Sequence, residues 1–234
     1  MSFQFVLGAT GTGKTEYVIQ KMHQQKEAAI YIVPEQYTLQ AQEDVINHSE
    51  AKGILDIEVL SFNRLVYRYF DELGLADTAM INDTGKSMLI RKVLESSNEA
   101  LVWIQKHRKK QGYMDELNKL LKECHQYNVD THTLNEYIQK VSPGLLQDKL
   151  KDLKVLLNEF DALMHQGYLT SEHAGMKLIE QIPNIQSLRE TTIYIDGFYG
   201  FTPLQYAFIE QFMNYCKEIV FVVTLPAGTH VADM

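Results

Sequence analysis

The sequence predicts an α/β protein whose parallel sheet is interrupted by a large all-helical insertion. In residues 1–75, short apolar runs alternate with segments of helical periodicity. No strand-like run then occurs before residues 192–196, and another comes at 218–224. Strands that alternate with helices pair in parallel through right-handed crossovers. We therefore expect a discontinuous α/β domain over 1–75 and 186–234, around a helical insertion domain over 76–185.

Three apolar runs in the first segment have the length of strands. The first, Phe5 to Leu7, ends at a glycine, the second, 28–33, stops at a proline, and the third, 57–60, precedes Ser61. Proline cannot continue a central strand, and serine commonly caps a helix. Continuous apolar runs are typical of buried strands in parallel sheets. We expect a helix after each run, the second of them over about 37–48.

The central segment shows helical periodicity only. Its clearest apolar stripe recurs at helical spacing and predicts a helix face that is part of a core. The stripe comprises Leu146, Leu150, Leu153, Leu157, Phe160 and Met164. The expected helices cover 84–96, 98–110, 113–126, 131–141, 145–165 and 171–181.

The strand pattern returns after the insertion. Residues 192–196 read TIYID and residues 218–224 read EIVFVVT. Between them we expect a helix with Pro203 in its first turn, where the missing N–H of proline has no intrahelical partner to lose. The predicted sheet therefore has five strands.

A glycine-rich loop follows the first predicted strand. Residues 8–15 fit the phosphate-loop (Walker A) pattern G-x-x-x-x-G-K-[ST] without a mismatch. Its glycines permit backbone angles at which consecutive N–H groups point at one anion, and the following helix turns its positive end to the same place. The flanking strand and helix favour a phosphate loop over a simple glycine-rich turn. The predicted nucleotide-binding residues are Gly8, Ala9, Thr10, Gly11, Thr12, Gly13, Lys14 and Thr15.

A second part of a nucleotide site is expected at the end of a neighbouring strand. Asp196 ends the strand at 192–196, and ligands gather at the carboxyl ends of parallel strands. We predict that Thr15 and Asp196 hold a magnesium ion; the alternative is an aspartate that only turns the strand into a loop. Many hydrolysing motors carry a glutamate after this aspartate, whereas here the next residue is Gly197. The sequence therefore predicts nucleotide binding but no carboxylate for cleavage at this position; one could come from elsewhere in the fold or from another chain.

The composition is that of an ordinary globular chain. It is 45% hydrophobic and carries a formal net charge of -8, so any DNA contact must be local. Cys124 and Cys216 lack metal-ligand spacing and indicate a reducing compartment, and we interpret Cys124–His125 as a packed thiol beside a surface imidazole. No signal peptide and no apolar run near the ~18 residues of a membrane span is present. We expect a cytoplasmic protein without a membrane partner.

Four sequence blocks resemble one known family. They are the phosphate loop, IVPEQYTLQ at 32–40, VLSFNRLVYRYF at 59–70 and IYIDGFYGFTPLQ at 193–205. Together they resemble the N-terminal part of the B subunit of AddAB-type ATP-dependent helicase-nucleases, which are related to superfamily-one helicases. The resemblance covers the α/β parts at both ends and implies the RecA-like fold of a P-loop NTPase.

The resemblance also implies nucleotide-site residues. Residues 8–15 would bind ATP, and Thr15 and Asp196 would bind its Mg²⁺. Gln205 would either contact the nucleotide or cap a helix.

Two of the blocks correspond to places where related helicases contact the backbone of single-stranded DNA. Short hydroxyl and amide donors suit phosphate oxygens, and Arg64 adds a positive charge. Phe62 would either stack on a base or fill the core. The implied DNA-binding residues are Thr38, Ser61, Phe62, Asn63 and Arg64.

The implied function is that of an ATP-binding N-terminal fragment of this B subunit. The family processes DNA double-strand breaks for recombinational repair, as a heterodimer with an A-type helicase-nuclease subunit. Its second motor domain, nuclease domain and iron-sulfur cysteines belong to parts that this sequence does not include. We therefore expect a fragment that binds nucleotide with weak or no hydrolysis, and that is neither a helicase nor a nuclease alone.

Two other functions are compatible with a phosphate loop. A small kinase or transferase needs an arginine-bearing lid soon after the loop, but no arginine lies between Met1 and Asn63. A nucleotide-independent scaffold would use the helical insertion to hold the partner subunit. Nucleotide titration separates the scaffold from the ATP-binding fragment.

Overall fold

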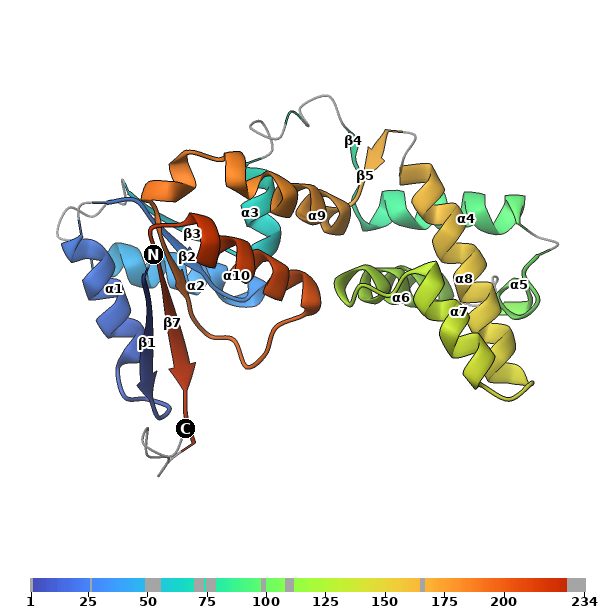
Figure 1. Ribbon diagram of the computed structural model, residues 1–234, viewed down its shortest axis with the longest axis horizontal. Helices are drawn as coiled ribbons and strands as arrows, with labels where there is room; N and C mark the ends of the chain where they lie inside the picture. Colours follow the sequence, from blue (N-terminus) through green and yellow to red (C-terminus); the bar gives the residue numbers. More distant parts are fainter. Residues whose placement is uncertain are drawn as a thin grey trace. The chain divides into compact units, whose positions relative to one another are not determined.

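The computed structural model divides the chain into two compact units (Figure 1). The sheet unit comprises Met1–Gly74, Lys177–Phe201 and Gln205–Met234, and the helical unit comprises Leu75–Met176 and Thr202–Leu204. The structure describes residues 2–25, 27–48, 56–69, 74, 79–97, 100–107, 112–164 and 167–226.

Five parallel strands form the sheet of the sheet unit, in the order β1-β7-β6-β2-β3. The predicted α/β class with a five-stranded parallel sheet is therefore confirmed. Thr192 of β6 pairs with Ala29 of β2 and with Glu218 of β7, so β6 lies at the centre of the sheet. The strands are β1 (Ser2–Gly8), β2 (Ala29–Ile32), β3 (Ile57–Leu60), β6 (Thr192–Ile195) and β7 (Glu218–Thr224).

Helices follow the strands as the alternating pattern predicts. Ser61 caps α3, and its hydroxyl oxygen accepts a hydrogen bond from the Arg64 N–H at 3.2 Å. Phe70, the last residue of the third sequence block, lies outside the described residues. The elements are α1 (Lys14–Gln24), α2 (Thr38–Asn47), α3 (Phe62–Arg68), α10 (Pro203–Tyr215) and the 3-10 turns η1 (Glu35–Tyr37), η2 (Ile182–Asn184) and η3 (Ser187–Glu190).

One core of the sheet unit fills the space between α1, α2 and one face of the sheet. Alternate strand residues point to this face, because side chains along a strand alternate. Removing these apolar surfaces from water is the main force that fixes the helices on the sheet. The core comprises Val18, Ile19, Met22, Ala29, Tyr31, Val33, Ala41, Val45, Val59, Tyr194, Val220 and Val222.

β1 departs from the expectation of a buried strand. Figure 1 shows it beside β7, at the edge of the sheet. Phe3 and Phe5 are 59% and 57% exposed, and the Phe5 ring stacks on Phe221 of β7 at a centroid distance of 5.4 Å. An edge strand of the described sheet has a neighbour on one side only, so an apolar sequence alone does not bury it.

The helical unit is built mainly from helices, as expected, but it also contains one pair of very short parallel strands. Ala79 pairs with Tyr168 and Met80 with Leu169. The expectation of an all-helical insertion is therefore wrong at this point. The elements are β4 (Ala79–Met80), α4 (Asp83–Ser96), α5 (Trp103–His107), α6 (Tyr113–Gln126), α7 (Thr131–Lys140), α8 (Leu145–Met164), β5 (Tyr168–Leu169) and α9 (Ser171–Gln181), whose last residues belong to the sheet unit.

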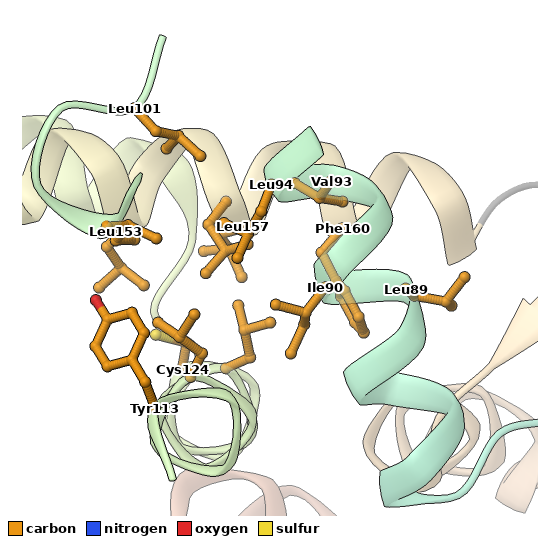
Figure 2. Packing of buried hydrophobic residues seen from close by; sticks show 14 of the residues in the cluster. Leu89, Ile90, Val93, Leu94, Leu101, Tyr113, Cys124, Leu153, Leu157 and Phe160 are labelled. Carbon is orange, nitrogen blue, oxygen red and sulfur yellow. The ribbon is translucent and has the colours of Figure 1, made fainter. Parts of the chain in front are cut away.

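α4, α6 and α8 enclose the core of the helical unit (Figure 2). Leu156 and Leu157 are fully buried there, at 0% and 1% exposure. The apolar stripe of α8 contributes to this core as predicted, except for Leu146, which is 57% exposed near the start of the helix. The core comprises Leu89, Ile90, Val93, Leu94, Leu101, Ile104, Tyr113, Leu117, Leu121, Cys124, Leu134, Leu153, Leu156, Leu157, Phe160 and Met164.

A buried carboxylate on α8 fixes the start of α5. Asp152 accepts hydrogen bonds from the backbone N–H groups of Val102, Trp103 and Ile104, at 3.0, 2.7 and 2.8 Å. These N–H groups have no partner within a helix that begins at Trp103. α5 is shorter than the helix expected over 98–110, of which 98–99 and 108–110 lie outside the described residues.

Within the described residues, no helix combines the length and the apolar character that crossing a membrane requires.

Candidate functional site

The loop between β1 and α1 has the backbone that the phosphate-loop motif requires. Gly11 and Gly13 take φ angles of 76° and 80°, which favour glycine. A side chain on Gly8 would place its Cβ 2.6 Å from the Thr12 hydroxyl oxygen. Each of these three glycines therefore has a steric reason in the fold itself.

The start of α1 presents backbone N–H groups and a lysine. Gly13 precedes the helix and gives no side-chain cap, so the N–H groups of the first turn have no side-chain partner there. The Lys14 amine donates to the Ala9 carbonyl at 2.7 Å, and the Thr12 hydroxyl donates to the same oxygen at 2.9 Å. Backbone N–H groups, a helix N-terminus and one mobile amine form a suitable donor set for phosphate oxygens.

Asp196 follows the central strand β6 and meets the phosphate loop. The Thr15 hydroxyl donates to its Oδ2 at 2.8 Å. The Tyr31 hydroxyl, from β2, donates to the same oxygen at 2.9 Å. Asp196 is only 8% exposed, and burial together with the Asp196 carboxylate raises the pKa of Tyr31, which keeps the phenol a donor. The structure thus brings together the two predicted metal ligands, Thr15 and Asp196.

A cavity of about 640 Å³ lies against the loop and the acid. Its lining includes Thr10 to Glu16, Asp196 and Gly197, and also Asp44 and His48 from the α2 region. The hydroxyl of Thr15 and the carboxylate of Asp196 are oxygen ligands of the type that Mg²⁺ takes beside a substrate phosphate. These residues could hold a nucleoside triphosphate with its metal ion.

The position after Asp196 is shaped for glycine. Gly197 has a φ of 80°, and a Cβ there would lie 3.3 Å from Cδ of Pro34. The other predicted nucleotide residue, Gln205, lies in the first turn of α10 and does not line this cavity.

The predicted DNA-contact residues gather around a carboxylate that the sequence analysis did not single out. The Ser61 hydroxyl donates to the Glu35 carboxylate, and the Arg64 guanidinium meets the same carboxylate at 3.2 Å. The Thr38 hydroxyl donates to the Glu35 carbonyl at 3.0 Å. Asn63 is exposed beside them. The Glu35 carboxylate thus occupies the donors of Ser61 and Arg64 with anionic oxygens, the same kind of group that a phosphate would present, while the Thr38 hydroxyl meets a backbone carbonyl.

Of the two roles considered for Phe62, the structure places the residue in the core. Its side chain is 6% exposed and its ring contacts Phe198, Phe201 and Phe208 at centroid distances of 5.6, 6.5 and 5.8 Å. Its aromatic face is therefore covered by protein.

Comparisons with known proteins cover almost the whole chain. The family model described as "ADDB, N-terminal" matches residues 5–233. A Lachnoclostridium phytofermentans protein, named as the B subunit of an ATP-dependent helicase/deoxyribonuclease, is 34% identical over 232 residues, which are 96% of this chain and 20% of that protein. Proteins of the same name from Geobacillus kaustophilus and Alkaliphilus oremlandii are both 32% identical, over 96% and 100% of this chain. The chain spans about one fifth of the length of the curated relatives it matches.

These matches extend the resemblance that the four sequence blocks carry. The blocks lie at the two ends of the chain, whereas the family model also covers the helical insertion. Because the family model matches residues 5–233 of this 234-residue chain, the chain belongs to the AddB N-terminal family.

Proposed function

We propose that this chain is a RecA-like P-loop NTPase domain that binds ATP and Mg²⁺. One observation carries the proposal: the hydroxyl of Thr15 and the carboxylate of Asp196, 181 residues apart in the chain, meet at 2.8 Å beside the phosphate loop. A pair of a loop hydroxyl and a strand-end acid is what a magnesium ion between protein and phosphates requires. A chance glycine-rich turn gives no reason for such a pair.

The bound nucleotide is hydrolysed weakly or not at all by this chain alone. The position after Asp196 carries no carboxylate to orient an attacking water, and its positive φ suits glycine. The domain therefore holds ATP while another part of the assembly would have to supply the group for cleavage.

The biological role follows from the relatives. They are named as the B subunit of an ATP-dependent helicase/deoxyribonuclease, which supports a role for this chain as the N-terminal part of such a protein. In that role it acts in the cytoplasm, in a heterodimer with an A-type helicase-nuclease subunit, on DNA ends that enter recombinational repair. The DNA that it contacts is mostly single-stranded.

Nucleotide titration tests the proposal. A fluorescent ATP analogue with Mg²⁺ is titrated into the chain and followed by anisotropy, while phosphate release is measured with and without single-stranded DNA. We expect saturable binding that Lys14→Ala weakens at least tenfold, without phosphate release above background. Lys21→Ala is the matched control, because Lys21 lies two turns further along α1 and bonds to Gln4 instead of the loop. Absence of binding, or equal binding by both variants, would contradict a phosphate-loop nucleotide site that works in this chain alone.

The DNA contact is tested separately. We propose that Thr38, Ser61, Asn63 and Arg64 bind a phosphate of single-stranded DNA, with Glu35 as the internal carboxylate that the phosphate replaces. Arg64→Ala is then expected to weaken binding of a labelled oligonucleotide and to reduce the slope of log affinity against log salt by about 1. Arg68→Ala is the control, since Arg68 lies one turn further along α3 and meets Glu58. An unchanged slope in Arg64→Ala would contradict the assignment.

A further inference from the structure

The helical unit contains a cluster of metal-ligand side chains that the nucleotide site does not use. His125 comes from α6, Asp161 from α8 and His173 from α9. One ligand atom of each lies within 4.8 Å of the others. All three residues line a cavity of about 510 Å³. Three helices therefore deliver two imidazoles and one carboxylate to one point with open space beside it.

The geometry of this cluster is close to that of a bound metal ion. The Asp161 Oδ1 lies 2.8 Å from the His125 Nε2 and 3.5 Å from the His173 Nε2. Tetrahedral zinc with bonds of about 2.0–2.1 Å holds its ligand atoms about 3.3 Å apart. The two distances fall on either side of that value, and the ligand atoms of the two imidazoles lie within 4.8 Å of each other, so side-chain rotations would bring all three ligands to one ion.

The Nδ1 atom of His173, which does not face Asp161, already has a hydrogen-bond partner. The His173 Nδ1 lies 2.7 Å from the Thr170 hydroxyl, and Thr170 is 1% exposed. Metal-bound histidines almost always donate a hydrogen bond from their other ring N–H, and this bond fixes the tautomer and the ring orientation. When His173 carries its proton on Nδ1, the Thr170 hydroxyl accepts a hydrogen bond from it, and the Nε2 atom of His173 can bind a metal ion in place of its contact with Asp161.

The cluster is partly buried and polar at the same time. His125 is 7% exposed, so the sequence-based expectation of a surface imidazole is wrong. Burial disfavours the charge on Asp161, but hydrogen bonds and charge from the two imidazoles outweigh burial and lower its pKa to about 2.

We infer that His125, Asp161 and His173 form a binding site for one divalent transition-metal ion of the zinc type. Two nitrogen ligands and one carboxylate are a known zinc set, in which water takes the fourth position, and here the cavity leaves room for that water. Mg²⁺ and Ca²⁺ prefer oxygen ligands throughout, so this site discriminates against the ion of the nucleotide site. The bound ion would join α6 and α8 to the first turn of α9.

Zinc titration of the whole chain tests this inference. After chelator treatment and desalting, Zn²⁺ is titrated against a competing fluorescent indicator, and Co²⁺ replaces it for visible absorption spectra. We expect one Zn²⁺ per chain, at least 100-fold weaker binding in Asp161→Asn and His173→Gln, and no competition from millimolar Mg²⁺. Circular dichroism and thermal unfolding without metal establish that these near-isosteric variants remain folded.

Two further variants separate a built site from a surface one. His132→Gln is the matched control, because His132 also lies beside a carboxylate, Glu136 at 3.8 Å, but is 81% exposed on α7. We expect it to bind Zn²⁺ like the wild type. Thr170→Val is expected to lose 10–100-fold in affinity, which Thr170→Ser restores.

Two results would overturn the inference. One is equal Zn²⁺ affinity in the wild type, Asp161→Asn and His173→Gln, which would place the ion elsewhere. The other is competition by Mg²⁺ at comparable concentration, which would indicate a site for hard cations. Neither result bears on the nucleotide site, because its residues belong to the sheet unit.

Discussion

At the scale of single residues, Gly197 occupies the position at which the nucleotide site would need a carboxylate for hydrolysis. Its backbone lies in the left-handed region, where a side chain costs roughly 1–2 kcal/mol. Pro34 also lies against the position of a Cβ. A glutamate at this position would strain the turn. The turn geometry therefore explains why the site has no carboxylate here.

Gly197→Glu is therefore expected to lower the free energy of unfolding by about 1–2 kcal/mol, without creating ATP hydrolysis. Urea denaturation and phosphate release measure the two quantities. Gly200→Glu is the control, since a Cβ on Gly200 meets no atom within 4 Å and its φ is not left-handed. A gain of hydrolysis in Gly197→Glu would show that the turn readily accepts a working carboxylate.

Residue-level prediction depends on local sequence signals. The phosphate loop is one contiguous pattern, and the place of Asp196 follows from the end of a strand. Tyr31 was part of an apolar run, and its bond to Asp196 spans 165 residues, which no local pattern contains. Glu35 was missed because a phosphate-binding site is recognised by its hydrogen-bond donors. The Glu35 carboxylate is instead an acceptor, and it bonds to two of those donors.

At the scale of elements, α5 shows how a tertiary contact defines a helix. Asp152 of α8 satisfies three N–H groups that the start of α5 leaves free, and it is itself 1% exposed. Removing it would leave one buried and two part-buried donors without this partner, which is costly.

Asp152→Ala is expected to destabilise the helical unit by roughly 3 kcal/mol, since three charge-assisted hydrogen bonds are lost. Urea unfolding can be followed by the fluorescence of Trp103, the one tryptophan of the sequence, which lies at the affected helix start. Glu159→Ala, on an exposed position of the same helix, is expected to change stability by less than about 0.5 kcal/mol. Similar losses in both variants would argue against the cap.

Helices and strands are predicted well where their apolar spacing is regular, and poorly where a boundary depends on a tertiary contact or an element is very short. The helix 113–126 was predicted to the residue, because its apolar spacing is regular and a glycine precedes it. The start of α5 depends on Asp152, about 50 residues away, and was placed too early. β4 and β5 have two residues each, too few to show the alternation by which strands are recognised.

At the scale of the whole molecule, each unit has its own core. One core lies between α1, α2 and the sheet, and the other lies among the helices of the helical unit. Val45 and Leu156 are both 0% exposed, one in each core. Changes at distant sites that share no partners act independently.

Leu156→Ala is therefore expected to lower the stability of the helical unit by about 2–5 kcal/mol while ATP affinity stays the same. Val45→Ala is the matched change in the core between α1, α2 and the sheet, and it is expected to weaken the hydrogen-exchange protection of the backbone amides in the sheet unit. Hydrogen exchange by mass spectrometry reports each unit separately. Loss of ATP affinity in Leu156→Ala would show that the two cores are coupled.

The pairing of β1 with β7 has a consequence for biosynthesis. In the described sheet, the strand that leads into the phosphate loop has one neighbour, and that neighbour follows 216 residues later in the chain. A ribosome that adds about 5–20 residues per second needs roughly 10–40 s to cover that distance. The main segment of the helical unit, Leu75–Met176, emerges within this interval, whereas β1 is still unpaired. The nucleotide loop is thus among the last parts of the nascent chain to gain its support, and a polypeptide released before β7 would lack the strand pairing that holds the loop.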